Sequence, residues 1–155
     1  MLKVQNVKRC KMMIEANEKN LDKLTELGLK LWPDNVYEDL KSEFRDSIVS
    51  DDEDMFLYED ADEYIGFIQL SIRNHYVEGC ESSPVAYLEG IFVEEGNRRS
   101  GIAQDMVIFA EKWGKDRGCV ELASDCELEN TLSIDFHKAI GFEEVNRLVC
   151  FKKNI

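Results

Sequence analysis

A short basic segment that contains a glycine, residues 98–103, carries the clearest chemical signal in this chain. It follows the apolar run 91–93 and precedes a helical pattern. The first turn of a helix leaves backbone N–H groups without intrahelical acceptors, and the helix dipole adds partial positive charge there. Gly101 and Ala103 are small enough to let a ligand approach the backbone, and two arginines add charge. The segment therefore predicts a binding site for an anion such as a pyrophosphate.

Two carboxylates lie in or directly after predicted strands and are candidate site residues. Glu89 interrupts the apolar run from Tyr87 to Ile91. Because an unpaired buried carboxylate is costly, Glu89 belongs either to the solvent face or to a site. Asp125 follows a strand pattern, where α/β sheets usually build their sites, and its alternative role is to cap the next helix.

Hydrophobic periodicity predicts the elements that position these residues. Helical spacing covers residues 20–31, 36–49, 101–115 and 130–140. Strand patterns cover residues 55–58, 64–72, 85–93, 119–123 and a final strand or pair at 142–151, with a further short strand at 11–16. This order predicts an α/β (α+β) fold with one layer of mixed sheet and helices packed on it. The 155 residues fit a single domain, and residues 1–10 are interpreted as an N-terminal extension.

The net charge of −13 argues against nucleic acid as a partner. The acids are concentrated between Asp34 and Glu63, where thirteen acids face only Lys41 and Arg45, a net of −11. One interpretation is a surface that keeps the protein soluble, and the other is a field that attracts a polycationic small molecule.

The same composition predicts where the protein works. No window approaches eighteen apolar residues, which excludes a membrane span, and the first ten residues lack the apolar core of a secretory signal. We therefore expect a cytoplasmic protein. Its five cysteines show no metal-ligand spacing, so we expect free thiols and no metal.

Residues 98–103, read as R-x-x-G-x-A between a strand and a helix, resemble the pyrophosphate-binding signature of the GNAT acetyltransferase superfamily. Asn130 stands where these enzymes place an asparagine on the CoA arm. The segment Phe136–Phe142 resembles the family motif Y-x-x-x-G-F, but His137 replaces the tyrosine that often protonates the departing CoA thiolate. His137 is therefore either the proton donor or a helix-surface residue.

A narrower resemblance, to the aminoglycoside 6′-N-acetyltransferases, extends from Ile14 to the C-terminus. It is carried by sequence blocks in the same order and at similar spacing: 31–34, 71–73, 76–79, 83–86, 88–93, 98–103, 123–125 and 151–155. The resemblance implies a GNAT fold, with a mixed, mostly antiparallel twisted sheet flanked by about four helices. It also implies acetyl-CoA as donor, the 6′-amine of an aminoglycoside antibiotic as acceptor, resistance as the outcome and a homodimer as the assembly.

The resemblance also assigns roles to individual residues. Those expected to hold acetyl-CoA are Ile91, Phe92, Val93, Arg98, Arg99, Ser100, Gly101, Ile102, Ala103 and Asn130. Those expected to bind the acceptor are Trp32, Asn35, Tyr76, Glu89, Asp125 and Asn146, the last in a C-terminal hairpin. Glu89, Asp125 and His137 are the catalytic candidates, with either acid taking the amine proton directly or through water. Trp32 is either a core residue or a stacking surface for a sugar ring.

Two other functions fit the same residues. One is acetylation of another polycationic amine, such as a polyamine or a basic peptide. The other is a catalytically silent module that binds acetyl-CoA, which the absence of the family tyrosine favours.

Overall fold

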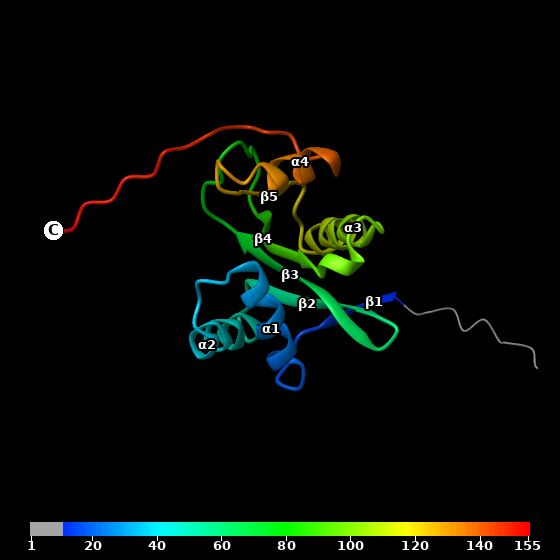
Figure 1. Ribbon diagram of the computed structural model, residues 1–155. Coiled ribbons are helices and arrows are strands. Elements are labelled where there is room, and N and C mark those ends of the chain that lie inside the picture. Colours follow the sequence, from blue (N-terminus) through cyan, green and yellow to red (C-terminus); the bar gives the residue numbers. More distant parts are fainter. Residues whose placement is uncertain (1–10) are drawn as a thin grey trace, which may run out of the picture.

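Residues 11–155 are described by a computed structural model and form one layer of sheet with helices on both faces (Figure 1). The elements, in chain order, are β1 (Lys11–Glu15), α1 (Leu21–Leu31), α2 (Tyr37–Ile48), β2 (Glu53–Asp60), β3 (Glu63–Arg73), β4 (Val85–Val93), η1 (Glu95–Asn97), α3 (Ile102–Asp116), β5 (Leu122–Ser124) and α4 (Thr131–Ala139). The N-terminal extension expected at residues 1–10 lies outside the described residues. No helix within residues 11–155 is long and apolar enough to cross a bilayer.

The five strands lie in the spatial order β1-β2-β3-β4-β5. Neighbouring strands are antiparallel, except that β4 and β5 run parallel. Side chains alternate between the two faces, as the pleat of a strand requires: Phe67 packs with α1 and α2, and its neighbour Ile68 packs with α3. The predicted mixed, mostly antiparallel sheet with four helices is confirmed.

Strand β4 carries an irregularity at its centre. Gln69 of β3 pairs with Gly90, whereas the next residue, Leu70, pairs with Leu88, so that Glu89 is the extra residue of a β-bulge. Bulges bend a strand and redirect a side chain, and they are frequent beside active sites. The bulge thus explains how a charged residue occurs inside an apolar strand.

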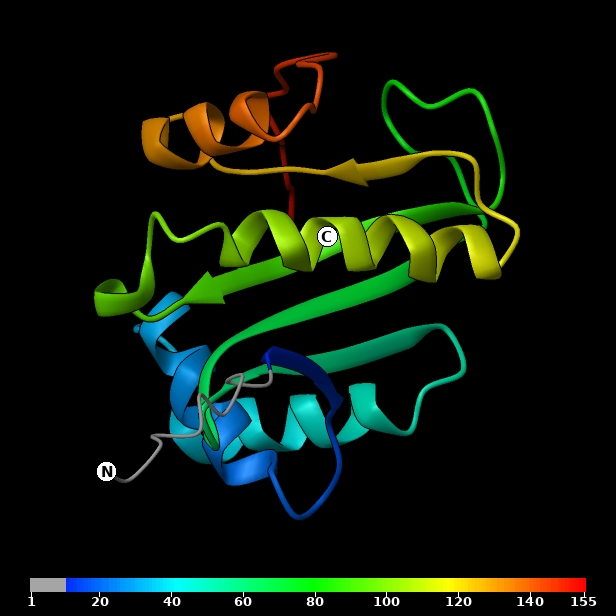
Figure 2. The ribbon, with the colours of Figure 1, turned by 90° about the vertical axis from the view of Figure 1, so that its right-hand side faces the viewer.

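Strands β4 and β5 separate immediately after this point. Their parallel pairing covers three residue pairs and ends at Leu88 and Ser124. Figure 2 shows β4 running down and away from β5 beyond that pair. We call this separation the fork. From Glu89 to Val93 the β5-facing edge of β4 therefore has no strand partner within residues 11–155.

One strand prediction was wrong, and the bounds of another were shifted. Residues 142–151 form no strand, and the chain after α4 passes over the body before its last residues run out to a distant C-terminus (Figure 1). A strand needs a neighbouring edge for its backbone N–H and C=O groups, and residues 142–151 pair with none within the described chain. The fifth strand begins at Leu122 rather than Cys119, because Gly118, with φ of 81°, ends α3 and the next residues make the return turn.

Candidate functional site

The segment between β4 and α3 is shaped as an open cradle. Gly101 has φ of 81° as the N-cap of α3, and Arg99 has φ of 61°. No atom lies within 4 Å of the place where a Cβ on Gly101 would stand. The next residue, Ile102, is buried in the core and anchors the helix. The N–H groups of the first turn are therefore held in place beside open space, as an anion site requires.

Arg98 and Ser100 shape this cradle. The Nε of Arg98 donates to the carbonyl oxygen of Val93 at 2.9 Å, and the hydroxyl of Ser100 donates to the carbonyl of Asn97 at 2.5 Å. The Arg98 bond ties the loop to the end of β4. Arg98 thus positions the cradle as well as charging it, a role that its sequence position alone did not indicate.

The other predicted cofactor residues divide by environment. The side chains of Phe92 and Val93 are buried and that of Ile91 is half-buried against the α3 core, so only their backbone is free to meet a ligand. Ala103 also packs against this core. Asn130 is the N-cap of α4, where its Oδ1 accepts the N–H of Ser133 at 3.1 Å. Its local role is therefore helix capping.

Glu89 is held by two polar side chains of β3. The Ser71 hydroxyl donates to its Oε1 at 2.5 Å, and Arg73 donates to both of its oxygens at 2.9 and 3.1 Å. Side chains of Arg73 and Glu89 are 30% and 28% exposed, so this bidentate pair is partly screened from water. The Glu89 carboxylate is therefore half-buried and held by two partners, which removes the cost of an unpaired buried charge.

Asp125 is linked to the same group through Tyr87. The Arg73 guanidinium stacks 3.3 Å from the centre of the Tyr87 ring, and the Tyr87 hydroxyl donates to Asp125 Oδ1 at 2.5 Å. Burial, followed by the bond to Asp125, raises the pKa of Tyr87, which therefore stays a donor at neutral pH. The N-cap of α4 is Asn130, so the alternative role of Asp125 as that cap is wrong. Sequence reasoning gave no role to Arg73 or Tyr87, although Ser71 and Arg73 share one face of a strand by their spacing.

The predicted acceptor residues line two cavities rather than one. Tyr76, Asp125 and Asn146 line a cavity of about 480 Å³. Trp32, Asn35 and Glu89 line a second cavity of about 410 Å³. Arg73 lines the first cavity and its partner Glu89 lines the second, so their ion pair lies between the two cavities.

The first cavity contains a polar cluster centred on Glu78. Glu78 accepts from the Tyr76 hydroxyl at 2.9 Å and from the Asn146 amide at 2.7 Å, and these bonds lower the pKa of Glu78. Asn146 reaches this site from the irregular C-terminal segment, not from the predicted hairpin. Glu78 was missed because a lone glutamate in a loop has no distinguishing pattern.

In the second cavity, Trp32 packs against Phe44 and Phe67, with ring centres 6.2 and 5.8 Å away. A Cβ on Gly90 would lie 2.5 Å from the Trp32 ring, so this glycine makes room for the indole. Asn35 donates to the Trp32 carbonyl at 3.3 Å. Trp32 is thus a packed residue whose ring also lines the cavity.

His137 is half-buried, not a surface residue, and it sits between the rings of Phe136 and Phe142. Its Nε2 lies 2.8 Å from the Ser124 hydroxyl, and its Nδ1 lies 2.7 Å from the Ser133 carbonyl oxygen. A carbonyl oxygen only accepts, so Nδ1 carries a proton. Nε2 is then an acceptor in the neutral ring and a donor in the imidazolium.

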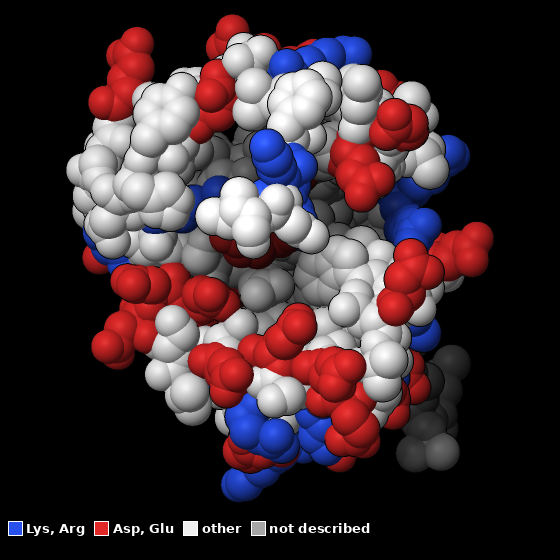
Figure 3. Space-filling view, turned by 90° about the vertical axis from the view of Figure 1, so that its left-hand side faces the viewer, with Lys and Arg blue, Asp and Glu red and all other residues white. Residues whose placement is uncertain are grey.

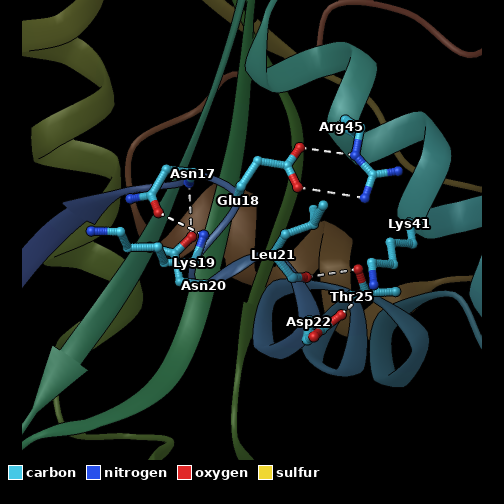
Figure 4. Close-up of polar contacts among 9 residues, drawn as sticks. All are labelled: Asn17, Glu18, Lys19, Asn20, Leu21, Asp22, Thr25, Lys41 and Arg45. Carbon is cyan, nitrogen blue, oxygen red and sulfur yellow. Dashed lines mark hydrogen bonds and ion pairs between the residues drawn. The ribbon is translucent and has the colours of Figure 1, made fainter.

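The acidic run between Asp34 and Glu63 keeps most of its charge. Its two bases form ion pairs with acids outside the run and so neutralise none of its own acids. Lys41 pairs with Asp22 of α1 at 2.5 Å, and Arg45 pairs with Glu18, just before α1, at 2.8 Å (Figure 4). Figure 3 shows this side of the molecule hollowed, with acidic side chains gathered below the hollow, over the half that carries α1 and α2. Within residues 11–155, no cluster of His, Cys, Asp and Glu has the form of a metal site.

Comparison with known proteins gives one consistent result. The sequence model of the acetyltransferase (GNAT) family matches residues 21–142. The aminoglycoside N(6′)-acetyltransferase type 1 of Serratia marcescens is 38% identical over 145 residues, which cover 93% of this chain and 99% of that relative. The structure of the aminoglycoside N-acetyltransferase AAC(6′)-Iy in complex with CoA superposes with a TM-score of 0.92 at 34% identity, over 98% of this chain and 100% of that one. The same enzyme in complex with the bisubstrate analogue CoA-S-monomethyl-acetylneamine gives a TM-score of 0.89 at 35% identity, over 94% and 99%.

The cradle at the start of α3, the bulge at Glu89 and the fork therefore occur in a chain that matches such enzymes over more than nine-tenths of its length. This chain belongs to the GNAT acetyltransferase family and, within it, to the group of aminoglycoside 6′-N-acetyltransferases.

Proposed function

We propose that this protein transfers the acetyl group of acetyl-CoA to the 6′-amine of aminoglycoside antibiotics and so confers resistance. The observation that carries the proposal is the arrangement along β4. An open anion cradle lies at one end of the strand, and the preorganised carboxylate of Glu89 lies at the fork. Relatives that match over almost their whole length carry this activity in their names, and one was solved with an analogue that joins CoA to an aminoglycoside.

The residues fit acetyl-CoA in two places. The cradle of residues 98–103 takes the pyrophosphate, because its N–H groups border the open space at Gly101. The free edge of β4 at Ile91–Val93 offers backbone groups to the extended pantetheine arm, and an N–H of the same free edge, nearer the fork, polarises the thioester carbonyl. Asn130 completes the predicted set at the start of α4.

The ammonium groups of the acceptor bind to two carboxylates, one in each cavity. Asp125 holds one ammonium group in the first cavity, where Tyr76 and Asn146 contact the drug. Glu89 faces the second cavity, where Trp32 and Asn35 lie. An amine attacks only after it loses a proton, and Glu89 or Asp125 accepts that proton directly or through water. These residues accelerate the transfer chiefly by holding the amine next to the thioester carbon.

A thiol-release assay tests this function. Acetyl-CoA is supplied with kanamycin, tobramycin, spermidine or no acceptor, and mass spectrometry with NMR of the product locates the acetyl group. Release with the two drugs and acetylation at the 6′ position is the expected result. Release with spermidine alone would make the protein an acetyltransferase for other polycations, and no release with any acceptor would make it a silent acetyl-CoA-binding module.

We further propose that the whole chain, residues 1–155, is one domain that works in the cytoplasm as a homodimer. The C-terminal segment supports the assembly, because its apolar side chains Val145, Leu148, Val149 and Phe151 are 58–92% exposed. Exposed apolar surface of this kind is typical of interaction sites. Light scattering should give twice the chain mass of 17.9 kDa, and the double substitution Val149→Glu and Phe151→Glu should yield monomers. A monomeric wild-type protein would contradict the proposal.

A further inference from the structure

The departing thiolate of CoA needs a proton, and the family tyrosine that would supply it is replaced by His137. The only polar side chain that its Nε2 contacts within residues 11–155 is Ser124, at 2.8 Å. Ser124 is the last residue of β5 and the register partner of Leu88, so its hydroxyl lies at the fork. A second contact, 3.3 Å to the Leu88 carbonyl oxygen, holds the hydroxyl there.

Ser124 lies on the opposite face of the sheet from the acceptor carboxylates. Leu88 and Leu122 pack in the core beneath α3, and Ser124, two residues after Leu122, shares their face. Tyr87 and Ala123 pack together on the other face, where Tyr87 binds Asp125. Ser124 and Asp125 nevertheless both line the first cavity, so a thioester held at the fork can meet the hydroxyl and the carboxylate from different faces of the sheet.

The length of β4 also suits this placement. The strand rises roughly 3.3 Å per residue, so the five residues from Val93 back to Leu88 span roughly 17 Å. That distance suits an extended pantetheine arm whose pyrophosphate is held in the cradle after Val93. The arm would bring its sulfur to the fork.

We propose that Ser124 donates the proton taken up by the CoA thiolate and that His137 replaces it; this proposal rests on the proposed acetyl transfer. As the tetrahedral intermediate collapses, the C–S bond breaks and its electron pair goes to sulfur. The sulfur takes the hydroxyl proton of Ser124, and the Ser124 oxygen takes the Nε2 proton of the His137 imidazolium. The ring is left neutral, with its Nδ1 proton still donated to the Ser133 carbonyl. The ammonium group of the acceptor loses one proton before it attacks and a second as the intermediate collapses. Both go to Glu89, Asp125 or water, so the amide, the thiol and the imidazole are all neutral at the end and the charges balance.

The geometry makes the pair a donor relay and not a simple contact. With an imidazolium, Nε2 donates to the Ser124 oxygen, and the Ser124 proton is free to point at the Leu88 carbonyl or at a ligand in the fork. With a neutral ring, the same proton turns to Nε2. His137 lines the first cavity, through which solvent restores its proton after each turnover. Ser124 is thus the catalytic group, and His137 acts through it.

Single-turnover kinetics test the relay, because they follow chemistry without product release. With enzyme in excess over acetyl-CoA and saturating kanamycin, thiol release should slow about tenfold to a hundredfold in Ser124→Ala, as expected for loss of a general acid. Ser124→Thr keeps a hydroxyl and should restore most of the rate. The KM for kanamycin and the calorimetric affinity for CoA should stay within twofold. The exposed Ser42→Ala on α2 is the matched control and should behave as the wild type.

His137→Gln provides an independent variant. Its side-chain amide donates to Ser124 but cannot give up a proton, so it should lose as much rate as Ser124→Ala, and the double variant should lose no more than either. A Ser124→Ala rate within twofold of the wild type, with His137→Gln still slow, would overturn the relay and make His137 the direct donor. An acetyl group found on Ser124 by mass spectrometry after mixing with acetyl-CoA would make Ser124 a nucleophile instead.

Failure of the relay and failure of the proposed function give different results. If the wild type acetylates spermidine but no aminoglycoside, the function is wrong, and the same variants are compared with spermidine as acceptor. If the wild type transfers acetyl to no acceptor, both proposals fall. If kanamycin is acetylated at wild-type rate by Ser124→Ala and His137→Gln alike, only the relay falls.

Discussion

Two glycines at opposite ends of α3 offer a matched test of the acetyl-CoA cradle. Gly101 precedes the helix and Gly118 follows it, and both have φ of 81°. Neither has an atom within 4 Å of the place where a Cβ would stand. A valine at either position therefore meets the same backbone strain and the same open space. The two sites differ in that only Gly101 faces the proposed pyrophosphate.

The size of each effect follows from this geometry. A residue with a Cβ in the left-handed region costs roughly 1–2 kcal/mol. Gly101→Val and Gly118→Val should thus lose similar stability, which for a domain of this length lowers Tm by roughly 2–4 °C per kcal/mol. At Gly101 the two methyl groups also project from the cradle floor and keep a pyrophosphate from the N–H groups. We expect at least a tenfold rise in the Kd for CoA, about 1.4 kcal/mol, in this variant alone.

Thermal denaturation and calorimetric titration with CoA measure the two effects separately. The expected pattern is a matched fall in Tm and a rise in Kd for Gly101→Val only. If the two variants bind CoA equally well, the cradle at residues 98–103 does not hold the pyrophosphate. If Gly118→Val weakens binding as much as Gly101→Val, the loss reflects strain in α3 and not contact with the ligand.

The remaining predictions concern charge. Glu89→Gln and Asp125→Asn should each lower kcat/KM for kanamycin about tenfold to a hundredfold, since charge-assisted hydrogen bonds contribute about 1.5–3 kcal/mol. Calorimetry should show that the affinity for CoA is unchanged. If both variants have wild-type kinetics, the acceptor binds elsewhere. Added salt should reduce kcat/KM, because it screens charges over about 10 Å at 0.1 M. The double variant Asp51→Asn and Asp52→Asn should show a shallower dependence of kcat/KM on salt at the same kcat. An equal salt dependence in the two proteins would leave the acidic run as a solubilising surface. Burial, together with Asp105, raises the pKa of Tyr58 to about 12. A raised folded-state pKa favours the neutral phenol, so the free energy of unfolding should hold below the ordinary pKa of 10.0 and fall as pH rises toward 12. Tyr58→Phe should reduce this fall in the free energy of unfolding, as measured by denaturant titrations at several pH values. The same pH dependence in the variant and the wild type would contradict the role of Tyr58.

The charge test leaves Asp54 in place because the structure gives it another task. Its Oδ2 accepts from the Trp113 indole and from Arg117, both at 2.7 Å, so it ties β2 to the end of α3. Its removal would disturb packing as well as the field. Asp51 and Asp52 are exposed and form no ion pair within the described chain.

Local pattern was sufficient for most elements of the fold. Helices α1 to α4 and strands β2 to β4 lie within a few residues of their predicted bounds, because apolar spacing near 3.6 or 2 reflects the face that each element buries. The final strand could not be predicted in this way. Val145, Val149 and Phe151 look like strand residues, but a strand also needs a partner edge, and that depends on the rest of the fold.

The sequence by itself determined the chemistry that is available: an arginine- and glycine-containing turn before a helix, a glutamate inside an apolar strand, and a histidine in place of the family tyrosine. Only the tertiary structure decided how these groups meet. Glu89 gains Ser71 and Arg73 through strand pairing and a bulge, and His137 gains Ser124 because α4 packs across the end of β5. Such contacts join residues 13 to 18 positions apart, and no local periodicity encodes them. They follow from the order and register of the strands, which is a property of the whole sheet.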